Sequence, residues 1–229
     1  SRKKSLLHFT TPVCRFKILA GAATIGCSEM ATALVTGIIT MMFNWTMLHY
    51  VGEDGVAAVT IIMYVLMFAS SLYTGYSYGV APMLSYYYGE QNHQKLKKLV
   101  VTSLKVIACI CLITVAASFM LTRPLVSVFA RPDNPVYELA VTGNRICTVA
   151  LFFIGFNIFA SGMFTALSNG IVSAVLAFSR SFVFMLITMI VLPLLLGVNG
   201  IWLATPAAEL MALMLSAFMF LKYKKRYGY

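Results

Sequence analysis

Charged side chains inside long apolar stretches are the residues of this sequence with the clearest chemical potential. Glu29, Arg180 and Glu209 each lie well inside such a stretch, and Arg145 does so in a fourth. At ~1.5 Å per helical residue, their positions correspond to depths of roughly 14–18 Å from the nearer helix end. Charges at that depth in a membrane are costly and mark functional sites by default. These four residues are therefore the first site candidates.

Arg180 and Glu209 fall on two consecutive apolar stretches that are expected to be antiparallel, and both come out near the midplane. An isolated ion there would cost several kcal/mol, and an ion pair much less. We therefore expect a midplane pair. It is interpreted first as a structural pair that fixes the helix register, with a role in ion coupling as the alternative.

Glu29 has no cationic residue at matching depth in its own hairpin. Lys105 on the third stretch is one candidate partner, although its side chain can equally extend back to the interface. An unpaired carboxylate that faces a cavity exchanges a proton or binds a cation. Glu29 is therefore the candidate for ion coupling, with sodium near it as the only metal-ion candidate. The alternatives are a structural role and a position at the membrane interface.

Uncharged residues supply the candidates for a substrate cavity. Asn44 and Asn157 are amides on apolar helices, where hydrogen bonding between helices is the default and a substrate contact is the alternative. Met42 belongs to a frequent class here, interpreted as lipid-facing or core filler, or as an adaptable lining for varied apolar ligands. Tyr73 begins a group of tyrosines for which an interfacial aromatic belt is the simplest explanation.

Enzyme chemistry is poorly supported by the sequence. All three histidines fall in expected loops or at helix ends, which leaves none for an intramembrane protease dyad. The sequence contains no metal-ligand cluster and no glycine-rich loop that would hold a phosphate. We therefore expect a protein that is not an enzyme and needs no cofactor.

The elements that position these residues are membrane-spanning helices. The chain is 60% hydrophobic and 10% charged, whereas soluble domains are about 45–50% apolar and about 25% charged. An all-α, polytopic membrane protein is predicted, with a basic lead-in over 1–21, a six-helix bundle over 22–221 and a basic tail over 222–229. The expected spans are 22–48, 56–78 with a helical continuation toward 88, 96–121, 137–167, 171–196 and 201–221.

Loop charge predicts the sidedness of these spans. Lysines and arginines gather before the first span, after the second and after the sixth, whereas acidic residues dominate the alternate side. The rule that basic loops stay inside then places both termini in the cytoplasm of a multi-pass protein of the cell (plasma) membrane. The net charge of +10 lies in these gaps and not on one soluble face, so nucleic acid is not an expected partner.

Several stretches resemble the multidrug and toxic compound extrusion (MATE) transporters, in order along the chain: Gly26–Glu29, Phe43-Asn44, Gly52–Ala58, Gly79–Gly89 and Gly200–Glu209. The resemblance implies the C-terminal half, spans seven to twelve, of a twelve-helix antiporter in which two six-helix bundles enclose a central cavity. Such proteins export organic cations and other amphipathic compounds in exchange for sodium ions or protons. The chain starts at Ser1 without an initiator Met, and we expect a piece of a longer chain whose partners are lipid, small substrates and the other half.

The sequence also departs from the family pattern. Sodium-coupled members carry an acid in the seventh helix that aligns nearer Gly37 than Glu29, and a second acid in the tenth helix, where Asn157 is the nearest polar residue. We expect alternating access around a cavity lined by the first, second and fourth helices of this half. Two alternatives stay open. A lipid-linked oligosaccharide flippase would be favoured by an arginine-lined midplane (Arg145, Arg180), and a membrane scaffold is disfavoured by Glu29.

Overall fold

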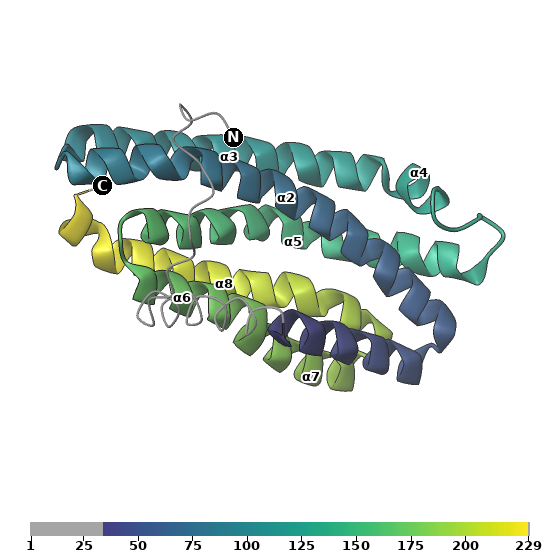
Figure 1. Ribbon diagram of the computed structural model, residues 1–229. Helices are drawn as coiled ribbons and strands as arrows, with labels where there is room; N and C mark the ends of the chain where they lie inside the picture. The colour runs from purple at the N-terminus through teal and green to yellow at the C-terminus, as the bar shows by residue number, and fades with distance from the viewer. Residues whose placement is uncertain (1–33, 229) are drawn as a thin grey trace, which may run out of the picture.

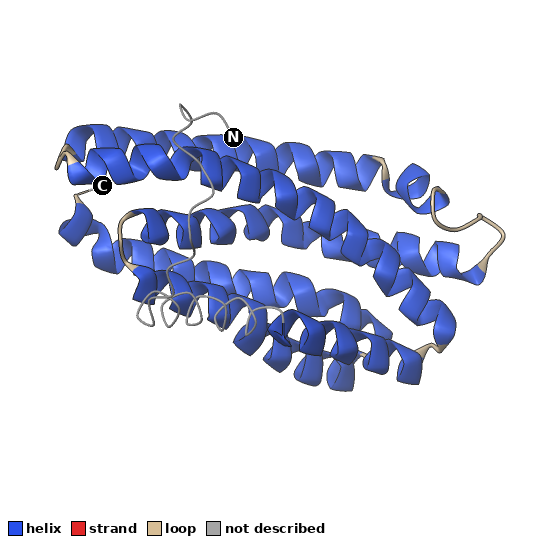
Figure 2. Cartoon of the chain, viewed as in Figure 1, coloured by secondary structure: helices blue, strands red, loops and turns tan. Residues whose placement is uncertain are grey.

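The computed structural model describes residues 34–228, and the regular structure in that range is helical throughout (Figures 1 and 2). Residues 34–50 form the first described helix. The elements that follow are α2 (Glu53–Gly89), α3 (His93–Met120), α4 (Thr122–Ser127), α5 (Pro135–Ala166), α6 (Gly170–Phe178), the π-helical η1 (Ser179–Phe184), α7 (Met185–Leu196) and α8 (Val198–Tyr227).

Asparagine marks the start of three of these helices. The side chains of Asn92, Asn134 and Asn169 accept hydrogen bonds from backbone N–H groups in the first turns of α3, α5 and α6, at 3.1, 2.9 and 3.3 Å. An N-cap of this kind satisfies one of the free N–H groups that begin every helix. The polar residues that separate the apolar runs therefore both interrupt one helix and start the next.

Helix α5 is the centre of the bundle, in contact with α2, α3, α4, α6 and α8 (Figure 1). Glycines permit two of these approaches. A Cβ on Gly143 would lie 2.6 Å from Ile62 on α2 and 2.9 Å from Trp202 on α8. A Cβ on Gly155 would lie 2.5 Å from the Cys111 Sγ on α3. Small residues on α5 thus set how closely three neighbouring helices pack around it.

The hairpin between α7 and α8 is tighter than the sequence predicted. Gly197, with φ of 58°, is the only residue between the two helices. Gly200 then passes so close to α7 that a Cβ would lie 2.0 Å from the Leu192 carbonyl oxygen. Only glycine fits at position 200, and the contact makes α7 and α8 antiparallel neighbours as the short gap indicated.

Five long helices in the described range are apolar enough to cross a membrane: α2, α3, α5, the continuous run Gly170–Leu196 and Val198–Lys224 of α8. They coincide with the second to sixth expected spans. The first expected span overlaps helix 34–50, and residues 22–33 lie outside the described residues. Large apolar side chains are exposed on the bundle surface, including Met120 and Ile171 at 80% and 81%. The predicted all-α, polytopic membrane fold is confirmed.

The end of α8 differs from the expected boundary at Leu221. The helix continues to Tyr227, whose side chain is only 2% exposed. The Tyr227 hydroxyl accepts a hydrogen bond from Asn169 Nδ2 (2.9 Å), and His93 Nδ1 donates to the Tyr227 carbonyl oxygen (3.0 Å). The first residues of the basic segment 222–229 are therefore an ordered turn of α8 that contacts the starts of α3 and α6.

Candidate functional site

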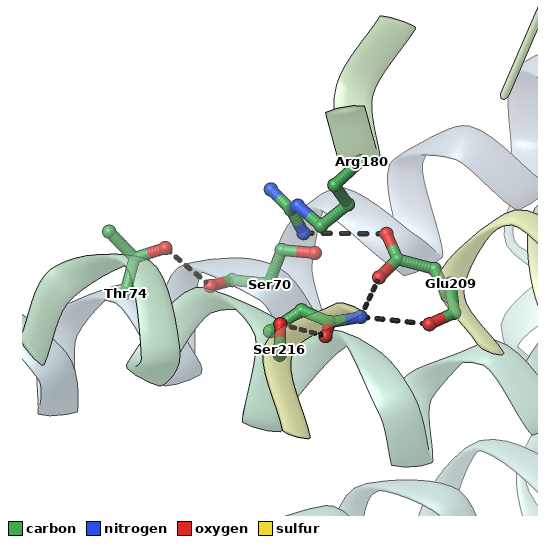
Figure 3. Close-up of polar contacts among 6 residues, drawn as sticks. Ser70, Thr74, Arg180, Glu209 and Ser216 are labelled. Carbon is green, nitrogen blue, oxygen red and sulfur yellow. Dashed lines mark hydrogen bonds and ion pairs between the residues drawn. The ribbon is translucent and has the colours of Figure 1, made fainter. Parts of the chain in front are cut away.

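A buried polar network joins α5, η1 and α8 near the middle of these helices (Figure 3). Arg180 Nη1 donates to Glu209 Oε1 at 3.3 Å. Asn157 Nδ2 donates to Glu209 Oε2 (2.8 Å) and to the Glu209 carbonyl oxygen (2.9 Å). Ser216 Oγ donates to Asn157 Oδ1 at 3.0 Å. Four side chains from three helical segments thus form one connected set.

Because the side chains of this network are buried, their polar groups must form hydrogen bonds with one another. Glu209, Asn157 and Ser216 are 7%, 2% and 4% exposed. A carboxylate taken out of water without partners would cost several kcal/mol. Here both of its oxygens accept hydrogen bonds, one from a guanidinium and one from an amide. The negative charge is therefore fully engaged inside the bundle.

Arg180 differs from its partners because its side chain keeps 24% of its surface exposed. It lines a cavity of about 700 Å³ whose other walls come from α2, α5 and α6. Among the described residues that line this cavity, Arg180 alone carries a formal charge. The rest of the wall combines apolar surface with hydroxyl groups, which are supplied by Thr74, Ser77, Tyr78, Ser85, Ser161 and Thr165.

The backbone that carries Arg180 is itself unusual. Ser179–Phe184 is a π-helical segment inside the fifth span, between α6 and α7. Such wide turns are rare and occur frequently at functional sites. The segment contacts α8, the helix that supplies Glu209. The wide turn therefore lies at the point where the fifth span presents its charge to both Glu209 and the cavity.

Most cavity hydroxyls have partners inside the protein. Ser161 and Thr165 on α5 both bond to Ser173 on α6, at 3.0 and 2.7 Å between hydroxyl oxygens. Thr74 Oγ1 donates to the Ser70 carbonyl oxygen one turn earlier in α2 (Figure 3). Ser77 is 4% exposed, and its hydroxyl has no hydrogen-bond partner among the described residues. Among the described cavity hydroxyls, it is therefore the buried one whose hydrogen-bonding capacity is unused.

The residues predicted from the sequence occupy distinct places. The Arg180–Glu209 pair forms an ion contact, and Asn157 joins it as a donor. Tyr73 is completely buried, its hydroxyl shared with Thr114 on α3, so the expectation that it lines a cavity is corrected: it is a core contact between α2 and α3. Glu29 lies outside the described residues.

Asn44 and Met42 lie on helix 34–50, and both are half-buried. Neither lines the cavity at Arg180, and neither does Asn157. The described wall of this cavity comes from the second, fourth and fifth spans, and the fifth contributes Ala177 of α6 and Arg180 of η1. The central cavity expected between the first, second and fourth helices stays a prediction.

Sequence reasoning missed Ser77, Ser216 and the hydroxyl cluster on α5 and α6. Ser216 follows Glu209 by seven residues, two helical turns along the same face, so the spacing alone indicated a shared environment. Nothing in the local sequence indicated the π-helical turn. Arg145, the other midplane arginine, is exposed and lies 5.7 Å from the Phe119 ring centre, as a cation over an aromatic face.

Known proteins with a similar sequence or structure identify the family of this chain. A sequence model of the MatE family matches residues 30–191. A comparison with curated proteins gives no match. An inward-facing multidrug resistance MATE family transporter of the MOP superfamily is similar in structure, with a TM-score of 0.83 and 21% identity over 93% of this chain and 50% of that one.

Two further solved structures are similar at 20% identity and a TM-score of 0.79. An outward-facing MATE family transporter covers 98% of this chain and 52% of its own, and a MOP superfamily transporter from Pyrococcus furiosus covers 93% and 48%. The chain therefore spans about half the length of the solved transporters that it matches. With its helical fold in agreement and its sequence matched over more than half its length, the chain belongs to the MatE family.

Proposed function

We propose that this chain is one six-helix half of a secondary active antiporter that works by alternating access. The complete protein would export organic cations and other amphipathic compounds in exchange for sodium ions or protons. Family membership and the half-length match to solved transporters support a transport role and a second half. The observation that carries the proposal is the cavity of about 700 Å³ next to a buried charge pair.

That cavity has the properties of a small-molecule site. Its volume lies within the roughly 300–1,000 Å³ typical of such sites, and its wall is mainly apolar with a few convergent polar groups. Buried ionisable groups in membrane helices characterise substrate and ion pathways. A passive scaffold would have no need for an arginine that is held by a buried carboxylate at the edge of a cavity.

The bundle ends support the proposed sidedness. The contacts of His93 with Tyr227 and of Tyr227 with Asn169 bring the starts of α3 and α6 and the end of α8 together. Lys95 and Lys222 are thus at the same end of the bundle, and Glu53 and Asp133 lie at the turns of the opposite end. The basic end is proposed to face the cytoplasm, in a plasma (inner) membrane.

Coupling is proposed to involve Glu29, with sodium or a proton as the driving ion. The test expresses the full-length parent protein in a cell that lacks its own efflux pumps and measures accumulation of a cationic dye. Glu29→Gln should abolish efflux, whereas Glu90→Gln, at an exposed glutamate just beyond α2, should not. Unchanged dye accumulation with the unmodified protein would refute multidrug export, and full efflux by Glu29→Gln would remove Glu29 as the coupling residue.

The driving ion is determined by the same cells in two further measurements. Efflux that stops when sodium is omitted identifies sodium coupling, and efflux that stops when the proton gradient is collapsed identifies proton coupling. The flippase alternative is supported by Arg180 but not by Arg145, which stacks on Phe119 and does not line the cavity at Arg180. Only one of the two midplane arginines therefore offers a charge to a pyrophosphate in that cavity.

A further inference from the structure

The charge that the described cavity wall offers to a ligand is positive. Arg180 uses one of its five N–H donors on Glu209, and Figure 3 shows the far end of the guanidinium directed away from that carboxylate. Glu209 lies behind it, with Oε1 held by Arg180 and Oε2 by Asn157. A cation in the cavity would have to displace Arg180 to reach the carboxylate.

We propose that this cavity is a subsite for the carboxylate group of anionic or zwitterionic amphipathic substrates, with Arg180 as the residue that binds it. The inference rests on the proposed export function and names a substrate class within it. Guanidinium groups bind carboxylates through paired, charge-assisted hydrogen bonds. The apolar part of such a substrate would pack on Tyr78, Pro82 and Ile158, which line the same cavity.

Ser77 supplies an independent observation. It lines the cavity wall on α2, it is 4% exposed, and its hydroxyl bonds to no described residue. A buried polar atom without a partner costs about 1–3 kcal/mol, so such atoms in native structures call for an explanation. Rotation about χ1 moves a serine hydroxyl among three staggered positions. The oxygen is covered in the observed rotamer, and in a rotamer that turns it to the cavity a ligand would give it the partner that the protein does not.

The test measures binding to the purified full-length transporter in detergent micelles. The probes are a rhodamine dye with a free carboxylate and the methyl ester of the same dye, in which a methyl group replaces that negative charge. Fluorescence polarisation gives the two dissociation constants, and their ratio cancels any contribution that both dyes share. The paired variant Arg180→Gln with Glu209→Gln removes both charges and keeps amides in place for hydrogen bonding.

The paired variant should lower the preference for the carboxylate dye by about tenfold, the usual size of a hydrogen bond to a charged group. Glu209→Gln alone should raise that preference, because Arg180 loses its competing carboxylate. Binding of the ester by each variant confirms that it is folded. A preference that stays within about twofold of the wild type in both variants overturns the subsite.

Serine variants provide a second readout that does not alter charge. Ser77→Ala should weaken carboxylate-dye binding several-fold while leaving the melting temperature unchanged or higher. Ser103→Ala is the matched control, since Ser103 is also buried and unpartnered among the described residues but lies on α3, away from the cavity wall. Equal effects of the two changes contradict the role of Ser77. If neither dye binds the wild-type protein, the proposed multidrug export fails and this inference fails with it.

Discussion

Replacing Arg180 by methionine should destabilise the protein through Glu209. The change removes the only ion pair among the described residues and leaves a carboxylate that is 7% exposed. Breaking a buried pair on one side costs roughly 3–5 kcal/mol. Asn157 would keep its two hydrogen bonds to Glu209, at 2.8 and 2.9 Å. The lower end of that range, about 3 kcal/mol, is therefore expected.

The partner change should cost less because the pair is asymmetric. Glu209→Gln retains an oxygen that accepts from Asn157, and the unpaired Arg180 side chain is already 24% exposed to the cavity. About 1 kcal/mol is expected for this variant, in the range of a single hydrogen bond. The double variant Arg180→Met with Glu209→Gln should lose about 1–2 kcal/mol of stability, because no buried charge is left without a partner.

The assay is unfolding of the purified full-length transporter by titration with sodium dodecyl sulfate in mixed micelles, followed by tryptophan fluorescence. The four proteins form a double-mutant cycle, in which a coupling energy of about 2–3 kcal/mol is expected. Single effects that simply add to within about 0.5 kcal/mol would show that Arg180 and Glu209 do not depend on each other, and would refute the reasoning from burial.

Two glycine predictions follow from close contacts. Gly200→Ala would place a methyl group 2.0 Å from the Leu192 carbonyl oxygen and should prevent α7 and α8 from pairing. The measurement is gel filtration, in which the monodisperse peak should be lost. Gly79→Ala is the control, because the space around Gly79 is open and the peak should stay intact. Gly155→Ala would lie 2.5 Å from the Cys111 sulfur and should cost about 1–3 kcal/mol. Cys111→Ala in the same chain should recover most of that loss, and failure to do so would place the strain elsewhere.

Helix positions were predictable from the sequence because a membrane imposes a simple rule on them. Apolar runs must be long enough to cross, and Gly, Pro and Asn interrupt them. The expected span 137–167 agrees closely with α5 at Pro135–Ala166, and the antiparallel pairing of α7 and α8 follows from the short gap between them. Counting residues also gave Arg180 and Glu209 comparable depths, and the structure places them 3.3 Å apart.

The site itself was less predictable because it depends on how helices face one another. The depth of a residue along a helix follows from counting, but its direction around the helix depends on packing and on local irregularity. The π-helical turn at Ser179–Phe184 carries Arg180, and no residue type signals such a turn. Packing also decided the position of Tyr73, which was expected at a cavity. It lies wholly inside the contact between α2 and α3.

The same wide turn separates two parts of the fifth span that are attached to different helices. Its first part, α6, is attached to α5 by the hydroxyl bonds of Ser173, and its last part, α7, is attached to α8 by the backbone contact at Gly200. Segment η1 lies between these two attachments and itself contacts α8. Because α5 and α8 also pack together and share the Asn157–Glu209 hydrogen bonds, a change in the wide turn would act first on the distance between Arg180 and Glu209.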